Sequence, residues 1–509
     1  MWEQVCRQMG TNKGQYYKYW GKASREDGGY HLLPYHCLDV AAVGYVLLEK
    51  HHHLRDSLAR LTGLDERSTE YWLPFLLSLH DIGKFSASFQ GLRADIFGSL
   101  QSRQWARADS PRHDNLGFML WRQSLREHSR QLGLLPKSDG ESLLTRNRPN
   151  GFEFWMQAVI GHHGVPPKQE GMCGDYFEAR DIDAASEFVS ATANLLLHTE
   201  LILPQPDFEQ SQIASWWLAG FAVLCDWLGS NTEYFSYSNV AQPLPEYWQL
   251  AIGNAGRAIA ATELLPSTAA DLMPLQSLFT PNIKTPTPLQ AHCENLALKD
   301  GPQLFILEDV TGAGKTEAAV MLAHRLLAAG NAQGIYFGLP TMATANAMYD
   351  RMATVYQRLF QGDTKPSLVL AHGARDLSAH FRQSIIPAQD NAPARYGDET
   401  ESAGSRCSAW LADNRKKALL AEVGVGTIDQ ALMAILPSRH QSLRLLGLLG
   451  KVLVVDEVHA CDAYMNRLLR KLLQAHAAGG GSAILLSATL PTQQRQQLVN
   501  AFLLICTQN

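Results

Sequence analysis

Hydrophobic positions between about Tyr30 and Leu265 recur at helical spacing. Apolar residues return every three or four positions, which is the period of an α-helix with one buried face. The clearest stretches are residues 35–50, 70–85, 151–163 and 213–230. No convincing alternating pattern, of the kind that predicts a strand, interrupts them. We therefore expect residues 1–265 to form an all-α domain.

The pattern changes after a proline-rich stretch. Prolines at positions 266, 274, 281, 286 and 288 prevent a continuous helix or inner strand, so residues 266–288 are predicted to be a linker. Beyond it, short apolar runs alternate with helical segments. These runs predict strands within residues 303–309, 334–340, 367–373, 423–429, 451–457 and 482–490.

Strands that alternate with helices indicate a parallel sheet covered on both faces. Residues 289–509 are therefore predicted to be an α/β domain. The polar stretch 387–406 reads as a mobile surface insertion.

Composition narrows the class of protein. The 509 residues are too many for one core, so two or three domains are expected. With 46% hydrophobic and 18% charged residues the chain is globular. Its net charge of −5 gives no global basic field for nucleic acid, although a local positive stripe is sufficient. No apolar run approaches the length of a membrane helix, and no signal peptide is evident. Eight scattered cysteines favour a reducing cytoplasm.

The sequence "LEDVTGAGKTEAA" follows a predicted strand and opens a predicted helix, which is the context of a phosphate-binding loop. Gly312 and Gly314 allow backbone N–H groups to surround a phosphate at the helix N-terminus. Lys315 would neutralise the β- and γ-phosphates of ATP, and Thr316 would hold Mg²⁺. Asp309 occupies the position where the full motif has a glycine.

Adjacent carboxylates follow the later apolar run "KVLVVDEVHA". The carboxyl edge of a parallel sheet is where ligands bind. Asp456 is therefore predicted to bind Mg²⁺ and Glu457 to orient the attacking water. "SAT" follows at the end of the next strand.

Together, "TGAGKT", "GLPTMATANAMY", "GTIDQ", "DEVH" and "SAT" resemble the first RecA-like lobe of a superfamily 2 DExD/H-box helicase. The resemblance implies that Gln290 reads adenine, that Thr341 and Thr427 contact single-stranded nucleic acid, and that coupling to ATP uses His459, Ser487 and Thr489. Such helicases also have a second RecA-like lobe and, in some families, a C-terminal domain. Neither is found in these residues, so we expect very low ATP hydrolysis by this chain alone.

The helical half contains several side chains that bind metals. The candidates are His36, His80, Asp81, His113, His162, His163 and Asp226. Imidazoles and carboxylates without thiolates suit Mn²⁺, Fe²⁺, Co²⁺, Ni²⁺ or Zn²⁺ rather than a structural zinc site.

A single histidine at a helix end more often lies at the surface, so the prediction depends on the set. Asp226 lies within the apolar stretch "WWLAGFAVLCDWLG", where a carboxylate is costly to bury unless a cation pairs with it. Asp81, next to His80 on one predicted helix, is placed to bridge two metals.

The order of these residues resembles the HD family of metal-dependent phosphohydrolases. With "YWGK", "HLLPYHCLDVAA", "LHDIGKF" and "AGFAVLCDWLGSN" ahead of a helicase lobe, the chain resembles the N-terminal portion of the CRISPR-associated helicase–nuclease of type I systems. The resemblance implies two metal sites that share one carboxylate. One would use His36, His80, Asp81 and Asp226, and the other Asp81, His113, His162 and His163.

The resemblance also implies cofactors and partners. The metals would be two divalent transition ions, Mn, Fe, Co or Ni, and the helicase lobe would bind ATP with Mg. Lys84 would steady a phosphate, with Lys22 as a weaker candidate. The partners would be single-stranded DNA and the RNA-guided surveillance complex Cascade, and no membrane is expected.

Two other functions remain open. An HD hydrolase of nucleotides with a regulatory ATPase lobe would use the same metal ligands, although "PTMATANAM" and "GTIDQ" then lack a role. A truncated docking fragment that does not turn over ATP is the non-catalytic alternative.

Overall fold

The computed structural model describes two compact units. It describes residues 14–24, 28–103, 105, 110–135, 151–168, 171–197, 207–262, 264–279, 283, 285–362, 364, 366–370, 419–436 and 441–506. Of these, residues 14–50 and 61–262 belong to a helical unit, and residues 51–60 and those from 264 onward to an α/β unit. The predicted fold class, a helical domain with a parallel-sheet α/β lobe, is confirmed. The predicted insertion at 387–406 lies outside the described residues.

The helical unit is built around α2. Its longer helices are α2 (Leu33–Lys50), α4 (Glu66–Ser78), α6 (Ala94–Gln101), α7 (His113–Leu120), α8 (Arg126–Gln131), α10 (Gly151–Ile160), α11 (Ala179–Leu196), α12 (Phe208–Gly229) and α13 (Leu244–Ala261). Helix α2 packs against α4, α12 and α13 and is buried along nearly its whole length. Because α2 is apolar on all sides, it lies inside the unit, with the other helices around it.

A short hairpin at the start of the helical unit corrects one prediction. Strands β1 (Trp20–Ala23) and β2 (Tyr30–Leu32) pair antiparallel, so a strand does occur within the region expected to be wholly helical. Each strand has only three or four residues, which is too short for an alternating pattern to stand out.

The α/β unit contains a six-stranded sheet in the order β3-β8-β7-β4-β6-β5, with all pairings parallel. The strands are β3 (Leu304–Glu308), β4 (Gly334–Leu339), β5 (Leu368–Leu370), β6 (Val423–Thr427), β7 (Lys451–Val455) and β8 (Ala483–Ser487). Each lies within a predicted run. Since all strands point the same way, the segments that follow them meet at one edge of the sheet.

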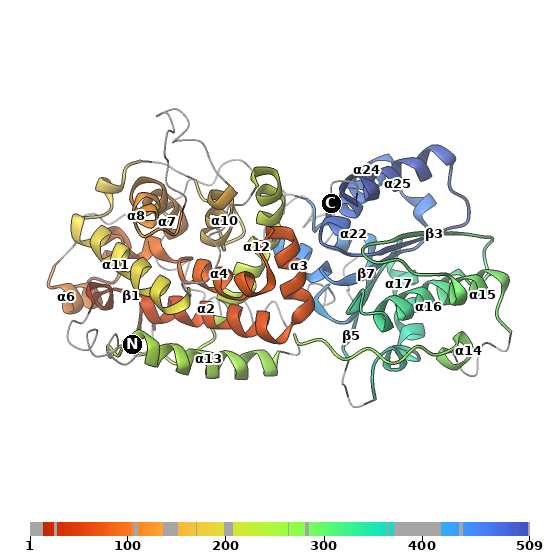
Figure 1. The fold of residues 1–509 in the computed structure, drawn as a ribbon, viewed down its shortest axis with the longest axis horizontal. Helices are drawn as coiled ribbons and strands as arrows, with labels where there is room; N and C mark the ends of the chain where they lie inside the picture. Colours follow the sequence, from red (N-terminus) through yellow and green to blue (C-terminus); the bar gives the residue numbers. More distant parts are fainter. Residues whose placement is uncertain are drawn as a thin grey trace. The chain divides into compact units, whose positions relative to one another are not determined.

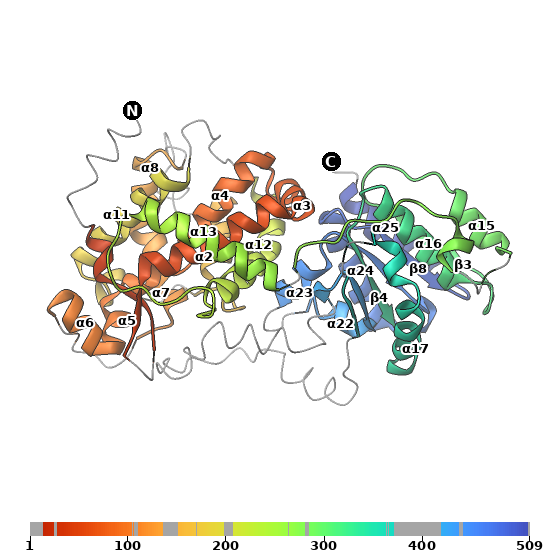
Figure 2. The same ribbon diagram turned by 90° about the horizontal axis from the view of Figure 1, so that it is seen from below.

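Helices cover both faces of this sheet. Figure 1 shows α16 (Lys315–Ala328) and α17 (Met342–Ala353) on one side, and α24 (Ala463–Ala478) and α25 (Thr492–Cys506) on the other. The shorter helices are α3 (His52–Thr62), α14 (Leu275–Leu278), α15 (Pro288–Asn295), α22 (Ile428–Leu432) and α23 (Gln441–Leu448). Figure 2 gives a second view of the two units. No helix in the described residues is long and apolar enough to cross a bilayer.

The described part of the predicted linker is packed against the α/β unit. Leu275 and Leu278 are fully buried in the core of that unit. The Ala270 N–H donates to the Leu359 carbonyl at 3.0 Å, and the Gln361 N–H donates to the Thr268 carbonyl at 2.9 Å. The prolines exclude regular structure over most of this segment, but its leucines still find apolar partners.

Candidate metal centre and nucleotide pocket

His80 and Asp81 lie in a turn. Helix α4 ends at Ser78, and residues 79–81 lead into the 3₁₀-helix η2 (Ile82–Phe85). We predicted that the two residues share a helix, which is wrong. The N–H of His80 bonds to Leu77 O at 3.1 Å, an i→i−3 bond that tightens and ends the helix. The turn directs both side chains inward, where each is buried.

His36, His80 and Asp226 form a first trio. His36 comes from α2, and Asp226 from α12. The Nε2 atoms of His36 and His80 are 3.3 Å apart, and each lies 3.7 Å from Asp226 Oδ1. All three residues are buried, so their ligand atoms face one another inside the protein.

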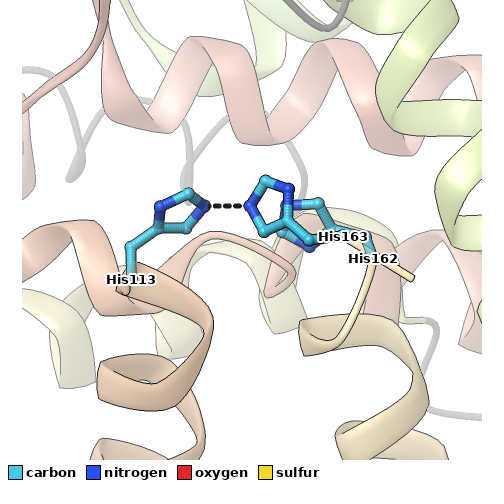
Figure 3. A group of neighbouring side chains, drawn as sticks. All are labelled: His113, His162 and His163. Carbon is cyan, nitrogen blue, oxygen red and sulfur yellow. Dashed lines mark hydrogen bonds between the residues drawn. The ribbon is translucent and has the colours of Figure 1, made fainter. Parts of the chain in front are cut away.

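His113, His162 and His163 form a second trio (Figure 3). His113 is the first residue of α7, and the other two lie in the turn after α10. The Nε2 atoms of His113 and His163 are 2.7 Å apart. His163 is the least buried of the three, which leaves one side of this trio closer to solvent.

Asp81 lies between the two trios. Its Oδ2 is 3.0 Å from His36 Nε2 and 3.3 Å from His80 Nε2. Its Oδ1 is 3.1 Å from His113 Nε2 and 3.7 Å from His162 Nε2. One oxygen therefore faces each trio, which is the arrangement that a bridging carboxylate needs.

Backbone carbonyls orient two of the imidazoles. His80 Nδ1 lies 2.8 Å from Leu77 O, and His162 Nδ1 lies 3.3 Å from Val159 O. A carbonyl only accepts, so each Nδ1 carries the hydrogen and each Nε2 presents its lone pair to the centre. Burial lowers the pKa of His162 to about 3 and holds the pKa values of His36 and His163 well below the usual range. Neutral imidazole is the form that binds metals.

The two carboxylates stay ionised despite burial. Burial alone would raise the pKa of Asp81, but Lys84, His80 and His113 hold this pKa well below its usual value. Burial likewise opposes ionisation of Asp226, whose pKa is lowered chiefly by Lys22 and by the histidines. The centre thus combines anionic oxygen donors with nitrogen donors, of which His36, His162 and His163 have lowered pKa values.

Lys84 is buried beside the carboxylate of Asp81. Its Nζ is 2.6 Å from Asp81 Oδ2 and donates to the Gly21 carbonyl at 3.1 Å. Its charge therefore acts on Asp81 directly, and its role with a phosphate stays a prediction.

These residues fit divalent transition metals. Neither oxygen of Asp81 makes a well-formed hydrogen bond to a donor in the described part of the chain. Four imidazole nitrogens lie within 3.7 Å of its oxygens, and His163 adjoins two of these imidazoles. Buried carboxylates are costly unless cations pair with them. Lys84 supplies one cation beside Oδ2 of Asp81, and Asp226 accepts a hydrogen bond from Ser230 Oγ at 3.0 Å. Mixed nitrogen and oxygen ligands suit first-row ions.

Gly83 lets η2, which directly follows Asp81, pack on the start of α7 at His113, and the sequence interpretation missed it. A Cβ at this position would lie 1.9 Å from the His113 carbonyl oxygen and 2.4 Å from Gly117 N. Only glycine therefore lets η2 pack directly on the start of α7. The glycine in "LHDIGKF" was visible, but nothing nearby in the sequence marks this long-range contact.

A pocket of about 430 Å³ lies at the loop before α16. Gly312 and Gly314 have φ of +88° and +81°, values that favour glycine. Lys315 Nζ donates to the carbonyls of Asp309 at 2.6 Å and Val310 at 2.9 Å. Every residue predicted to bind ATP and Mg lines this pocket, and so does Glu457. The predicted residues are Gln290, Gly312, Gly314, Lys315, Thr316 and Asp456.

Gln290 is tied to the backbone of this pocket. Its Oε1 accepts from Thr287 N at 3.0 Å, and its Nε2 donates to Gly314 O at 3.3 Å. The side chain thus joins the start of α15 to the phosphate-binding loop.

A chain of polar contacts leaves the pocket. Glu457 has φ +52°, an uncommon conformation for a residue other than glycine. Its Oε2 is 3.1 Å from His459 Nε2, and His459 Nδ1 is 3.2 Å from Ser487 Oγ. Ser487 donates to the Thr489 carbonyl at 2.9 Å. The structure therefore brings the predicted coupling residues together.

Thr341 and Thr427 lie at the same edge of the sheet as the pocket. Leu339 of β4 pairs with Thr427 of β6, and Thr341 caps α17 just beyond β4. Thr427 is buried, whereas Thr341 lies in an exposed hydrogen-bonded turn. Their contact with nucleic acid stays a prediction.

Two charged residues that the sequence interpretation did not identify also line the pocket. Glu317, in the first turn of α16, forms an ion pair with Arg351 of α17. Glu317 directly follows the predicted loop motif, which was a usable signal. Nothing in the sequence around Arg351 indicates such a position.

Comparisons with known proteins agree with these features. Residues 20–235 match the family model described as Cas3, HD domain. The chain is 36% identical to the CRISPR-associated endonuclease/helicase Cas3 of Escherichia coli (strain K12), over 95% of this chain and 55% of that protein. A structure titled T. fusca Cas3-ATP aligns with a TM-score of 0.73 and 26% identity, over 96% of this chain and 52% of that one.

A further structure is titled CRISPR RNA-guided surveillance complex, pre-nicking. It aligns with a TM-score of 0.64 and 25% identity, over 97% of this chain and 50% of that one. The chain spans about half the length of the curated relatives it matches. Over nearly its whole length the chain is similar to CRISPR-associated Cas3 nuclease/helicases, and residues 20–235 match the HD domain of that family.

Proposed function

We propose that this chain is a metal-dependent nuclease of single-stranded DNA, joined to an ATP-binding helicase lobe, that degrades target DNA in CRISPR defence. The observation that carries the proposal is Asp81, with one carboxylate oxygen facing each of two histidine-containing trios. The relatives support it, since they are named as CRISPR-associated endonuclease/helicases.

The residues of the centre have distinct tasks in this proposal. A pair of divalent ions, when bound, supplies Lewis-acid stabilisation of a phosphodiester displacement. Asp81 would join the two sites, and the trios would fix the ligand geometry. Leu77 O and Val159 O keep two imidazoles in the tautomer that presents Nε2. Lys84 keeps Asp81 anionic.

The ATP-binding part of the proposal rests on the pocket. Lys315 and Thr316 would hold the phosphates and Mg²⁺, while Asp456 and Glu457 would bind the metal and orient water. The contacts from Glu457 through His459 to Ser487 support coupling to the sheet edge where Thr341 lies.

The proposed partner is an RNA-guided surveillance complex. The structural neighbour whose title names such a complex supports this assignment. Guide pairing then supplies sequence specificity, and the nuclease needs only the backbone and stacking contacts that suffice for single strands.

Metal removal tests the nuclease. We expect the protein to nick circular single-stranded DNA without ATP in Mn²⁺, Co²⁺ or Ni²⁺, and to lose this activity in EDTA. Nicking is followed by gel electrophoresis, with mononucleotides as competing substrates. If mononucleotides are hydrolysed instead and the circle stays intact, the centre is a nucleotide hydrolase. If neither substrate is cleaved by folded, metal-loaded protein, a docking role is favoured.

Lys315→Ala is expected to weaken nucleotide binding without changing nicking of free single strands. The loss of a charge-assisted contact to phosphate weakens binding by about tenfold or more. Binding is measured by fluorescence of a labelled ATP, and Lys299→Ala, an exposed lysine of the same unit, is the control. Loss of nicking in Lys315→Ala would contradict the division of tasks between the two units.

A further inference from the structure

A second cation lines the nucleotide pocket beside Lys315. Arg351 of α17 lies in the lining together with Thr316 and Asp456. It belongs to none of the motifs that mark the phosphate-binding loop or the metal carboxylates. A guanidinium in a phosphate pocket needs an explanation, because its fork of N–H donors matches phosphate oxygens.

The topology explains how α17 reaches this pocket. Strand β4, which precedes α17, pairs with β7, and Asp456 follows β7 directly. Asp456 N–H donates to the Gly338 carbonyl of β4 at 3.0 Å. The charge of Arg351 acts on Asp456, lowering the pKa of that carboxyl against the larger effect of burial. Arg351 and Asp456 line the same pocket, and α17 follows the strand whose Gly338 carbonyl accepts the hydrogen bond from Asp456.

The ion pair with Glu317 keeps Arg351 at the pocket. The Arg351 side chain is 43% exposed and that of Glu317 is 15% exposed. An ion pair this open to water contributes little stability. A phosphate group, with more charge and more acceptor oxygens, can therefore compete with Glu317 for the guanidinium.

We propose that Arg351 binds the terminal phosphate of a nucleoside triphosphate. Until the triphosphate enters, the ion pair with Glu317 keeps the Arg351 side chain at the pocket. The inference rests on the proposed nucleotide site. Asp456 and Thr316 would hold Mg²⁺ at the terminal phosphates, and Arg351, which lines the same pocket, would meet the terminal phosphate there. Arg351 thus makes this lobe select ATP over ADP with its own residues.

The test compares binding of labelled ATP and labelled ADP, with Mg²⁺, to the full chain. Arg351→Ala is expected to weaken ATP binding by about tenfold or more and ADP binding far less. Arg351→Lys keeps the charge but loses the forked pair of N–H donors. Its ATP affinity should lie between those of the unaltered chain and Arg351→Ala. Glu317→Gln is expected to tighten ATP binding by a few fold, and this gain should vanish in the double variant with Arg351→Ala. Arg467→Ala, an exposed arginine of the same unit, is the control.

The outcomes separate this inference from the nucleotide site. Suppose that Lys315→Ala weakens the binding of both nucleotides, while Arg351→Ala leaves the ratio of ATP affinity to ADP affinity unchanged. The nucleotide site then stands, and the proposed role of Arg351 is overturned. If the unaltered chain binds neither nucleotide, both proposals fail. If the Glu317→Gln gain persists without Arg351, Glu317 acts by repulsion alone and its restraint of Arg351 is overturned.

Discussion

Asp81→Asn is expected to abolish metal-dependent nicking of single-stranded DNA. Asparagine keeps the shape of the side chain but removes its charge and one of the two oxygens that face the trios. The rate should fall by about a hundred- to a thousandfold, the scale seen when an electrostatic stabiliser is removed from an active site. Nicking assays and the stoichiometry of Co²⁺ binding by calorimetry measure the loss.

The controls separate chemistry from folding. Asp81→Asn also leaves Lys84 without its anion, which costs stability, so thermal unfolding is recorded in parallel. Asp226→Asn keeps the Lys84–Asp81 pair and should lose metal only at the first trio. Asp183→Asn, an exposed residue of α11, should match the unaltered chain. Full nicking by a folded Asp81→Asn variant would exclude Asp81 as the bridge.

Gly83→Ala is expected to destabilise the helical unit strongly, although it adds only one methyl group. The added Cβ would meet the His113 carbonyl at 1.9 Å, and because backbone blocks it on both sides, η2 and α7 must separate. Such overpacking costs about 3 kcal/mol. A loss of that size lowers the melting temperature by about 6–12 °C in a unit of this length.

The matched control is Gly253→Ala in α13, where an added Cβ meets nothing within 4 Å. Alanine in an open helical position stabilises by about 0.5–1 kcal/mol. Differential scanning fluorimetry with and without Co²⁺ measures the melting temperatures of both variants and how far the metal raises them. Equal melting temperatures and equal metal affinity for the two would show that the contact of η2 with α7 does not hold the centre.

Local sequence patterns were enough to predict the strands and the phosphate-binding loop of the α/β unit. Its strands are short apolar runs bounded by turn signals, and the phosphate-binding loop and "DEVH" each lie within a few residues of a strand end. The parallel sheet then brings those ends to one edge, so proximity followed from topology. The identity of the metal-capable residues was also visible, because carboxylates and imidazoles are unusual in apolar segments.

What could not be predicted depends on contacts between distant segments. The turn at His80 arises from hydrogen bonds that end α4 at Ser78, before the apolar pattern ends at residue 85. The need for Gly83 comes from the backbone of α7, about 30 residues away. Arg351 looks like an ordinary polar position of an amphipathic helix, and only its pairing with Glu317 distinguishes it.

The order of the ligands along the chain has a consequence for synthesis. His163 completes the second trio, and Asp226 completes the first only 63 residues later (226 − 163). Chains emerge from the ribosome from the N-terminus onward and domains fold as units. A nascent chain therefore lacks the full centre until α12 has been translated. The proposed nuclease would thus stay inactive while it is being made.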